Sequence, residues 1–321
     1  MYRSRSHSYR ELPLRMAEIG GMYRLELSGV LGGLNRVRSI QLNDAHIFCT
    51  VDQVAEEAEA ALALIRKAHE AMGIPGARYR LSLPGPGGKY IDDPAMWERS
   101  IALLRSILEA SGLEYEAVEG EAAFYGPKID VQVVDSAGRE FSLSTVQVDF
   151  HQPEQFDLHY IGPDGAKHRP VMVHRSIIGS IERVVSHLIE VHGGAFPAWL
   201  APVQVAVLPL TDAEMPQAAA LVERCVDLGL RVELHAPERG SLGARIREAR
   251  LVPYQAVIGA REAANGDVAL RLRDGRRLDA RPVEQVLADM REQIARRDGA
   301  GLGDACPRSH PAQPPRPDAI A

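Results

Sequence analysis

Three stretches of the sequence place basic and carboxylate side chains at close spacing, and two of them are rich in arginine and histidine. Arginine suits phosphate and carboxylate chemistry, because its planar guanidinium grips two oxygens at once. These stretches therefore hold the residues best able to position and neutralise negative charge. They are residues 15–49, 124–130 and 174–183.

Common nucleotide and metal motifs do not account for these residues. The sequence has no Gly-x-Gly-x-x-Gly. Residues 85–89 look like a phosphate loop, but Leu83 and Tyr90 stand where that loop requires Gly and Ser or Thr. His187, Glu190 and His192 fit neither His-Glu-x-x-His nor its inverse. We interpret the first segment as a plain turn and the second as polar positions on a helix.

Composition narrows the class of protein. The chain has 321 residues, 37 basic and 43 acidic side chains and a net charge of −6. This length suggests about two domains, and no apolar run reaches the ~18–20 residues of a membrane span. The basic N-terminus lacks the apolar core of a secretory signal. Cys49, Cys225 and Cys306 are too widely spaced for a disulfide framework or a zinc ribbon. We expect a cytoplasmic protein that is neither a membrane protein nor a bulk nucleic-acid coat.

Residues 1–200 combine amphipathic helices with long strand-like stretches. Apolar residues at helical spacing predict helices over 53–72 and 94–111. Strand runs joined by turns predict an antiparallel sheet backed by these helices. The expected strands cover residues 21–26, 36–49, 78–82, 129–134 and 140–150.

Residues 201–298 alternate strands with helices, which predicts a smaller, mostly parallel α/β domain. A Pro-rich junction at 197–202 is the expected domain boundary. Residues 299–321 are rich in Gly, Ala and Pro, so we expect a disordered tail. The expected elements of this domain are strands at 203–210, 231–235, 254–259 and 267–273, and helices at 211–228, 241–250 and 283–297.

In their order along the chain, the three stretches resemble the catalytic core of the threonyl-tRNA synthetases, a family of class II aminoacyl-tRNA synthetases. Arg24-Leu-Glu26 matches motif 2 of that class, and Gly179-Ser-Ile-Glu-Arg183 matches motif 3. The strings at 44–49 and 124–129 are those that point to threonine. The resemblance runs from about residue 8 to about residue 297.

This resemblance implies the fold class α/β: an α+β catalytic domain with an antiparallel class II synthetase-type sheet, followed by a smaller α/β anticodon-binding domain. It implies a threonine–tRNA ligase, which activates L-threonine with ATP and transfers it to tRNA(Thr). The implied cofactors are Zn²⁺ and Mg²⁺, with ATP as a substrate. A homodimer is expected for the family, with no membrane or DNA partner.

The resemblance also assigns roles residue by residue. The implied catalytic residues are Arg24, Lys128 and Arg183. The implied ATP-binding residues are Arg24, Glu26, Arg36, Thr145, Gln147, Ser180 and Arg183. The implied threonine-binding residues are Asp44 and Tyr125, and the implied anticodon contacts are Arg247, Glu262 and Arg271.

The implied zinc site is incomplete in this sequence. His46 and His174 match two zinc ligands, whereas the family's third ligand is a cysteine in a Cys-Pro-Gly-His string just upstream of the residue that opens this sequence. Cys49 matches a position that is not a ligand, and a substitute role for it stays open. Motif 1, which builds the dimer interface, is also missing, so we expect a fragment or a start codon assigned too late.

Several positions depart from the family pattern. Leu42 stands where an active-site glutamine is usual, and Ser142 replaces an adenylate-contacting glutamine. Residues 248–253 are about two residues shorter than usual, which affects anticodon reading. The alternatives are a catalytically inactive, tRNA-binding or regulatory paralogue and an enzyme that activates another amino acid.

Overall fold

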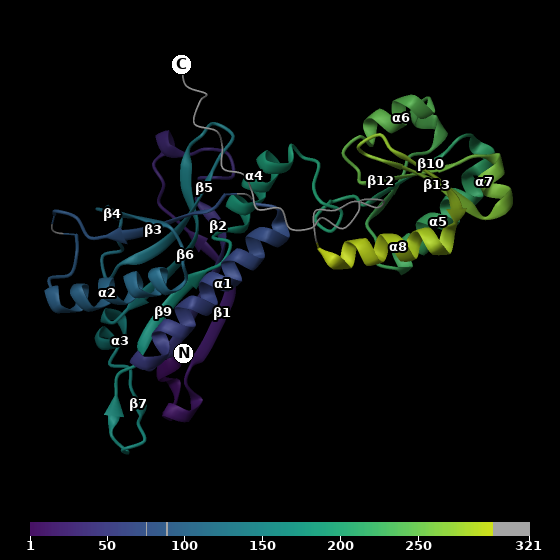
Figure 1. Cartoon of the computed structure of the whole chain (residues 1–321). Coiled ribbons are helices and arrows are strands. Elements are labelled where there is room, and N and C mark those ends of the chain that lie inside the picture. The colour runs from purple at the N-terminus through teal and green to yellow at the C-terminus, as the bar shows by residue number, and fades with distance from the viewer. Residues whose placement is uncertain (75, 88, 298–321) are drawn as a thin grey trace. The chain divides into compact units, whose positions relative to one another are not determined.

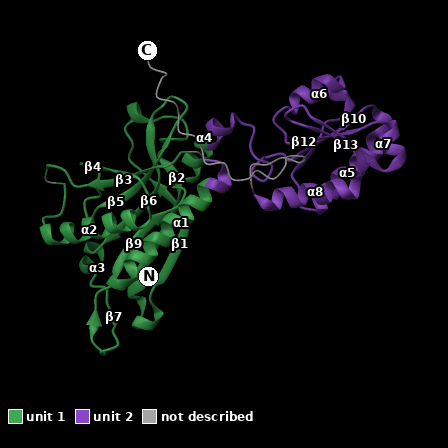
Figure 2. Ribbon diagram, in the orientation of Figure 1, with its two compact units in different colours: residues 1–69, 75–187 green, residues 70–74, 188–321 purple. Residues whose placement is uncertain are grey.

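Residues 1–74, 76–87 and 89–297 are described by the computed structural model of the protein. The chain divides into two compact units, Met1–His69 with Pro75–His187 and Glu70–Ile74 with Leu188–Ala321 (Figure 2). The tail expected at 299–321 lies outside the described residues. Every helix among the described residues is too short or too polar to traverse a lipid bilayer.

The first unit is built on a seven-stranded sheet in the order β1-β2-β9-β6-β5-β3-β4 (Figure 1). Only the β3–β4 pair of this sheet is parallel, which confirms the predicted antiparallel class. The strands are β1 (Leu14–Tyr23), β2 (Ser39–Cys49), β3 (Arg78–Leu83), β4 (Tyr115–Glu119), β5 (Lys128–Val134), β6 (Glu140–Asp149) and β9 (Val171–Ser176).

Helices and one hairpin complete this part of the chain. Helix α2 begins where Pro94 opens its first turn and Asp93 accepts a hydrogen bond from the Met96 amide at 2.9 Å. The last residues of α1 and α4 belong to the second unit. The elements are α1 (Val54–Met72), α2 (Pro94–Ala110), α3 (His151–Gln155), β7 (Tyr160–Ile161), β8 (Lys167–His168) and α4 (Ile181–His192).

The two faces of the large sheet have different chemistry, as β5 illustrates. Ile129, Val131 and Val133 are fully buried, and the first two belong to the core that α1 and α2 form with the sheet. Because side chains alternate along a strand, Lys128 and Asp130 project from the opposite face. One face of the sheet is therefore committed to packing, and the other is free to carry a polar site.

The first strand differs from its prediction. A strand was expected over 21–26, whereas β1 spans Leu14–Tyr23 and pairs with β2 along its whole length. Gly20 and Gly21, which weaken an isolated strand, lie inside it opposite Leu42 and Gln41. Ten consecutive residue pairs outweigh that local preference, since strand formation depends on pairing more than on intrinsic propensity.

The second unit contains a five-stranded sheet in the order β11-β10-β12-β13-β14. Its β10–β11 and β10–β12 pairs are parallel, but β12–β13 and β13–β14 are antiparallel, so the expected mostly parallel sheet is mixed. The turn at Asp274-Gly275 returns the chain as a hairpin instead of a crossover. The elements are β10 (Val205–Pro209), α5 (Met215–Asp227), β11 (Val232–Leu234), α6 (Leu242–Glu248), β12 (Tyr254–Ile258), α7 (Ala260–Asn265), β13 (Asp267–Leu272), β14 (Arg277–Pro282) and α8 (Val283–Arg296).

Candidate active site

A cavity of about 500 Å³ opens on the polar face of the large sheet. It is lined by β2, β5, β6, β9, the segment after β1 and the start of α4, so residues distant in sequence meet there. Leu42 also lines it. The residues from the sequence prediction that line the cavity are Arg24, Asp44, Tyr125, Lys128, Thr145, Gln147, His174, Ser180 and Arg183.

Arginines gather at one end of this cavity. The half-buried Arg183 donates from Nε to the Asn35 carbonyl at 2.9 Å. Burial lowers the pKa of Arg183, and the nearby positive charges of Arg24 and Arg36 lower it further, against the opposing effect of Glu26. Repelling cations held together in this way are arranged to receive an anion.

Glu26 and Arg36 lie beside that end of the cavity and bind each other. Arg36 Nε is 3.0 Å from Glu26 Oε2, and Arg38 Nε donates to the Glu26 carbonyl at 3.1 Å. The backbone continues this cross-link, because the Arg24 amide donates to the Arg38 carbonyl at 2.8 Å. These contacts tie residues 24–26 to residues 36–38.

Two imidazoles face each other at another part of the site. His46 and His174 are direct partners in the β2–β9 register, and their ring centroids lie 4.7 Å apart. Burial lowers the pKa of His46, and His174 adds to this, while Asp44, Glu18 and Asp149 act in the opposite direction. Both imidazoles are thus held near carboxylates on the polar face.

His174 has a fully buried carboxylate behind it. His174 Nε2 lies 2.8 Å from Asp149 Oδ2, and Asp149 has no exposed surface. Because a carboxylate accepts, the imidazole donates its Nε2 proton, and in the neutral ring the proton is then absent from Nδ1. This tautomer leaves Nδ1 available as a ligand.

The described residues do not complete a metal site around this pair of imidazoles. They contain no cluster of three His, Cys, Asp or Glu side chains that could hold an ion. Cys49, three residues after His46, faces the opposite side of β2, is fully buried in the core, and contacts the Val171 carbonyl at 3.8 Å. Burial also raises its pKa to about 12. Cys49 therefore cannot complete the site in this fold.

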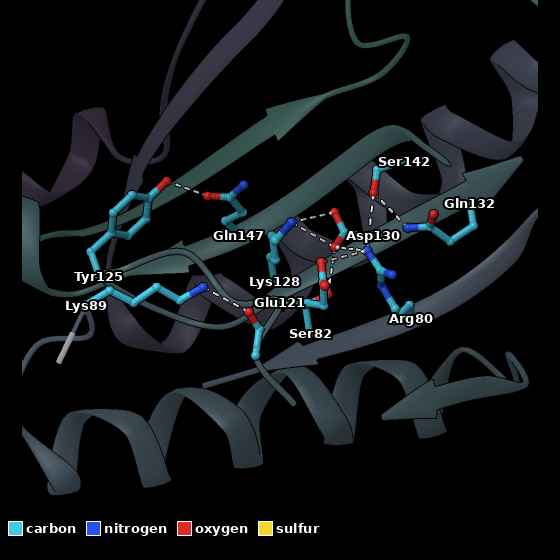
Figure 3. A network of polar contacts seen from close by, with 11 residues as sticks. Arg80, Ser82, Lys89, Glu121, Tyr125, Lys128, Asp130, Gln132, Ser142 and Gln147 are labelled. Atoms are coloured by element: carbon cyan, nitrogen blue, oxygen red, sulfur yellow. Dashed lines mark hydrogen bonds and ion pairs between the residues drawn. The ribbon is translucent and has the colours of Figure 1, made fainter. Parts of the chain in front are cut away.

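A polar network connects Lys128 and Tyr125 to the sheet (Figure 3). Lys128 Nζ lies 2.9 Å from Asp130 Oδ2, and the Tyr125 hydroxyl donates to Gln147 Oε1. Burial raises the pKa of Tyr125, and the charges of Asp149 and Asp44 add to that shift. Lys128, Tyr125 and Gln147 are thus fixed by hydrogen bonds before any ligand arrives.

Sequence reasoning missed Asp130 and Asp149 as site residues. Asp130 alternates with core residues on β5, and Asp149 does so on β6 after the fully buried Val148. An acidic residue within an apolar strand could have indicated these positions, because an acid is rarely fully buried without partners. Lys128 lies on the same strand as Asp130, but Ser82, Arg80 and His174 come from other strands, and the sequence does not show those contacts.

In the second unit, the three predicted anticodon residues lie on three elements. Arg247 is exposed on α6, Glu262 lies in the first turn of α7 and Arg271 is half-buried on β13. Glu262 Oε2 accepts from the Gly259 amide at 3.1 Å, which caps α7. The contacts of the described residues do not join these three side chains to one another.

Comparison with known proteins places this architecture in a class. Residues 1–192 match the family described as tRNA synthetase class II core domain (G, H, P, S and T), and residues 204–293 match the anticodon binding domain. The chain belongs to the class II tRNA synthetase family.

Within that class, the similar curated proteins are named threonine–tRNA ligases. The protein from Geobacillus sp. (strain WCH70) is 44% identical over 92% of this chain, and that from Bacillus velezensis is 48% identical over 84%. The chain spans about half the length of these relatives, 47% and 43%.

Solved structures agree in fold. The RNA binding domain of threonyl-tRNA synthetase from Cryptosporidium parvum superposes with a TM-score of 0.84 at 32% identity, covering 95% of this chain and 75% of that one. A putative threonyl-tRNA synthetase from Aeropyrum pernix gives 0.74 at 27% identity, covering 90% and 71%.

Proposed function

We propose that this chain carries the catalytic and anticodon-binding parts of a threonine–tRNA ligase. The observation that supports this most is the single cavity in which Arg24, Arg183 and Lys128 lie with Asp44 and Tyr125. The ligase activates L-threonine with ATP to give threonyl-adenylate and pyrophosphate, and then transfers threonine to tRNA(Thr). We place it in the cytoplasm as a homodimer with no membrane or DNA partner.

In activation, a carboxylate oxygen of threonine attacks the α-phosphorus of ATP and pyrophosphate leaves. Arg24 binds the α-phosphate and the threonine carboxylate, and Arg183 binds the far phosphates. Lys128 neutralises charge at the reacting oxygens. Such preorganised donors are the largest source of acceleration in reactions of this kind.

The remaining nucleotide contacts surround these three cations. Glu26 reads the adenine amino edge and Arg36 contacts phosphate, which requires their mutual ion pair to open. Mg²⁺ accompanies ATP and its pyrophosphate product. The other ATP contacts are Thr145, Gln147 and Ser180.

Threonine selection requires recognition of a hydroxyl, because valine is nearly isosteric. A site that hydrogen-bonds the hydroxyl rejects an analogue lacking it far better than a shape-only pocket can. Asp44 and Tyr125 supply polar groups for this purpose. His46 and His174 would hold zinc, which when bound supplies a Lewis acid for the substrate amino and hydroxyl groups. The Nδ1 left free on His174 fits that role.

A second candidate is an enzyme that activates another amino acid, or a paralogue without activity. The observation that favours it is Leu42, an apolar side chain in the cavity wall where a polar group would serve threonine better. Arg247, Glu262 and Arg271 are the proposed anticodon contacts under either function.

ATP–pyrophosphate exchange in the full-length natural protein tests this proposal. Exchange should depend on threonine and be far weaker with valine. Arg24→Ala and Arg183→Ala should each reduce it about 100- to 1,000-fold, since each removes a charge-assisted contact at the transition state. The control Arg10→Ala removes an exposed arginine of the same unit and should leave the rate unchanged. Exchange that prefers another amino acid would favour the second candidate.

A further inference from the structure

Asp130 is a carboxylate without exposed surface on the polar face of the large sheet. It follows Lys128 by two residues on β5, so both side chains project from the same face. The Lys128 ammonium lies 2.9 Å from Oδ2 and 3.1 Å from Oδ1 of Asp130. Both carboxylate oxygens therefore engage the one cation that extends into the cavity wall from this strand.

Other donors fix the carboxylate in place. The buried Ser82 hydroxyl donates to Asp130 Oδ2 at 2.6 Å, and Arg80 Nη2 lies 3.4 Å from the same oxygen. Figure 3 shows Asp130 between Lys128 and Arg80. A buried polar group that is satisfied by several partners is held rigidly.

The Arg80 nitrogen that contacts Asp130 has two further partners. Its Nη2 lies 3.5 Å from Glu121 Oε2 and 3.5 Å from Ser142 Oγ, and Gln132 Nε2 donates to the same hydroxyl at 2.7 Å. The cluster thus contains two cations and two carboxylates. Removing Asp130 would leave Arg80 and Lys128 as like charges without the anion between them, which is costly in a partly buried site.

We propose that Asp130 is a positioning residue that holds the Lys128 ammonium in place for the reacting phosphate. It does not touch the substrate, because its oxygens are taken by Ser82, Arg80 and Lys128, and it acts through Lys128. This inference rests on the proposed function, in which Lys128 contacts the reacting oxygens. Preorganisation of this kind removes the cost of orienting the cation during the reaction.

Amine labelling of the full chain tests the contact without requiring turnover. Trace acetic anhydride is added, and acetylation at Lys128 and Lys89 is measured by peptide mass spectrometry. Lys89 is exposed and donates to the Gly120 carbonyl at 3.0 Å, so it serves as an internal reference. Asp130→Asn should raise labelling of Lys128 about tenfold, the effect of removing one opposite charge at hydrogen-bond distance, with Lys89 unchanged.

A matched control separates this effect from a general loss of charge. Glu140→Gln removes the acid from the Arg78–Glu140 pair, which joins strands β3 and β6 of the same sheet at 2.5 Å. It should leave labelling of both lysines unchanged. If thermal melting shows that Asp130→Asn does not fold, labelling is measured in Ser82→Ala instead. This variant removes a donor to Asp130 and should raise Lys128 labelling several-fold.

Kinetics test the consequence for the reaction. Asp130→Asn should lower kcat of pyrophosphate exchange about 100-fold, the cost of a misplaced catalytic group, with little change in KM for ATP. That loss should disappear in a Lys128→Gln background, since the two residues act as one unit. A merely structural role would lower the rate equally in both backgrounds.

The outcomes distinguish the two claims. ATP should protect Lys128 from labelling in the unmodified chain, and absence of protection would contradict the proposed function. Protection by ATP, together with unchanged Lys128 labelling in Asp130→Asn and Ser82→Ala, would overturn the positioning role of Asp130 alone.

Discussion

At the scale of single residues, His174 illustrates how a buried carboxylate selects the chemistry of its neighbour. Asp149 accepts from His174 Nε2 at 2.8 Å and from the Gln152 amide at 2.8 Å, so it is fixed on both sides. A metal-ligating histidine usually donates its other nitrogen to such a group, which orients the ring and raises its basicity. Asp149 therefore supports the proposed zinc site without contacting the ion.

This arrangement predicts that Asp149→Asn weakens zinc binding about 10- to 100-fold, the usual effect of removing such a partner. The measurement is competition with a colorimetric zinc chelator in the full-length natural protein. The matched control is Asp164→Asn, which removes the carboxylate from an exposed aspartate–histidine pair. In that pair Asp164 Oδ2 lies 2.9 Å from His168 Nε2. Equal zinc affinity in both variants would exclude a supporting role for Asp149.

At the scale of secondary-structure elements, the sequence indicated residues that the fold brings into one cavity, but not the partners that hold them. Arg24, Lys128 and Arg183 stand in recognisable strings, and the cavity brings them together. The Lys128–Asp130 pair was within reach, because both residues lie on one strand. Ser82 and Arg80 were not, since their approach depends on the β3–β5 register. The bounds of β1 were not predicted either, because they depend on its pairing with β2.

Helix α1 and strand β6 are coupled by a buried histidine. His69 Nε2 lies 2.9 Å from Ser144 Oγ, and the Ser144 hydroxyl donates to the Ile177 carbonyl at 2.5 Å. Burial lowers the pKa of His69 to about 4, with a further contribution from His187. His69 is therefore neutral in the folded protein well below the pH at which it gains a proton in the unfolded chain.

This difference gives a signed pH dependence of stability. Below about pH 6.5 the unfolded chain binds a proton at His69 that the folded protein does not. The free energy of unfolding therefore decreases as the pH is lowered from about 6.5 to about 4. Between pH 7 and pH 5 the loss from this group is about 2 kcal/mol. Urea unfolding at both pH values, in the unmodified chain and in His69→Gln, measures it. The prediction is wrong if the variant retains the same pH dependence.

At the scale of the whole molecule, the proposed function assigns a different part of the ligase reaction to each unit. The first unit has a cavity lined by arginines and a lysine, and the second has a mixed sheet within the segment that matches an anticodon binding domain. In the proposed function neither unit suffices alone, because activation without tRNA recognition would not assign an amino acid to a codon. We propose that one protein carries out both activation and tRNA recognition.

Charging of tRNA(Thr) with labelled threonine measures activation and tRNA recognition in one assay. The full-length natural protein should form acid-precipitable threonyl-tRNA(Thr) only when ATP is present. Arg247→Ala with Arg271→Ala should raise the KM for tRNA while leaving threonine-dependent pyrophosphate exchange intact, and the difference should shrink as salt rises, since phosphate contacts release counterions. Failure to charge tRNA(Thr) under conditions that support exchange, or preferential charging with another amino acid, would contradict the account.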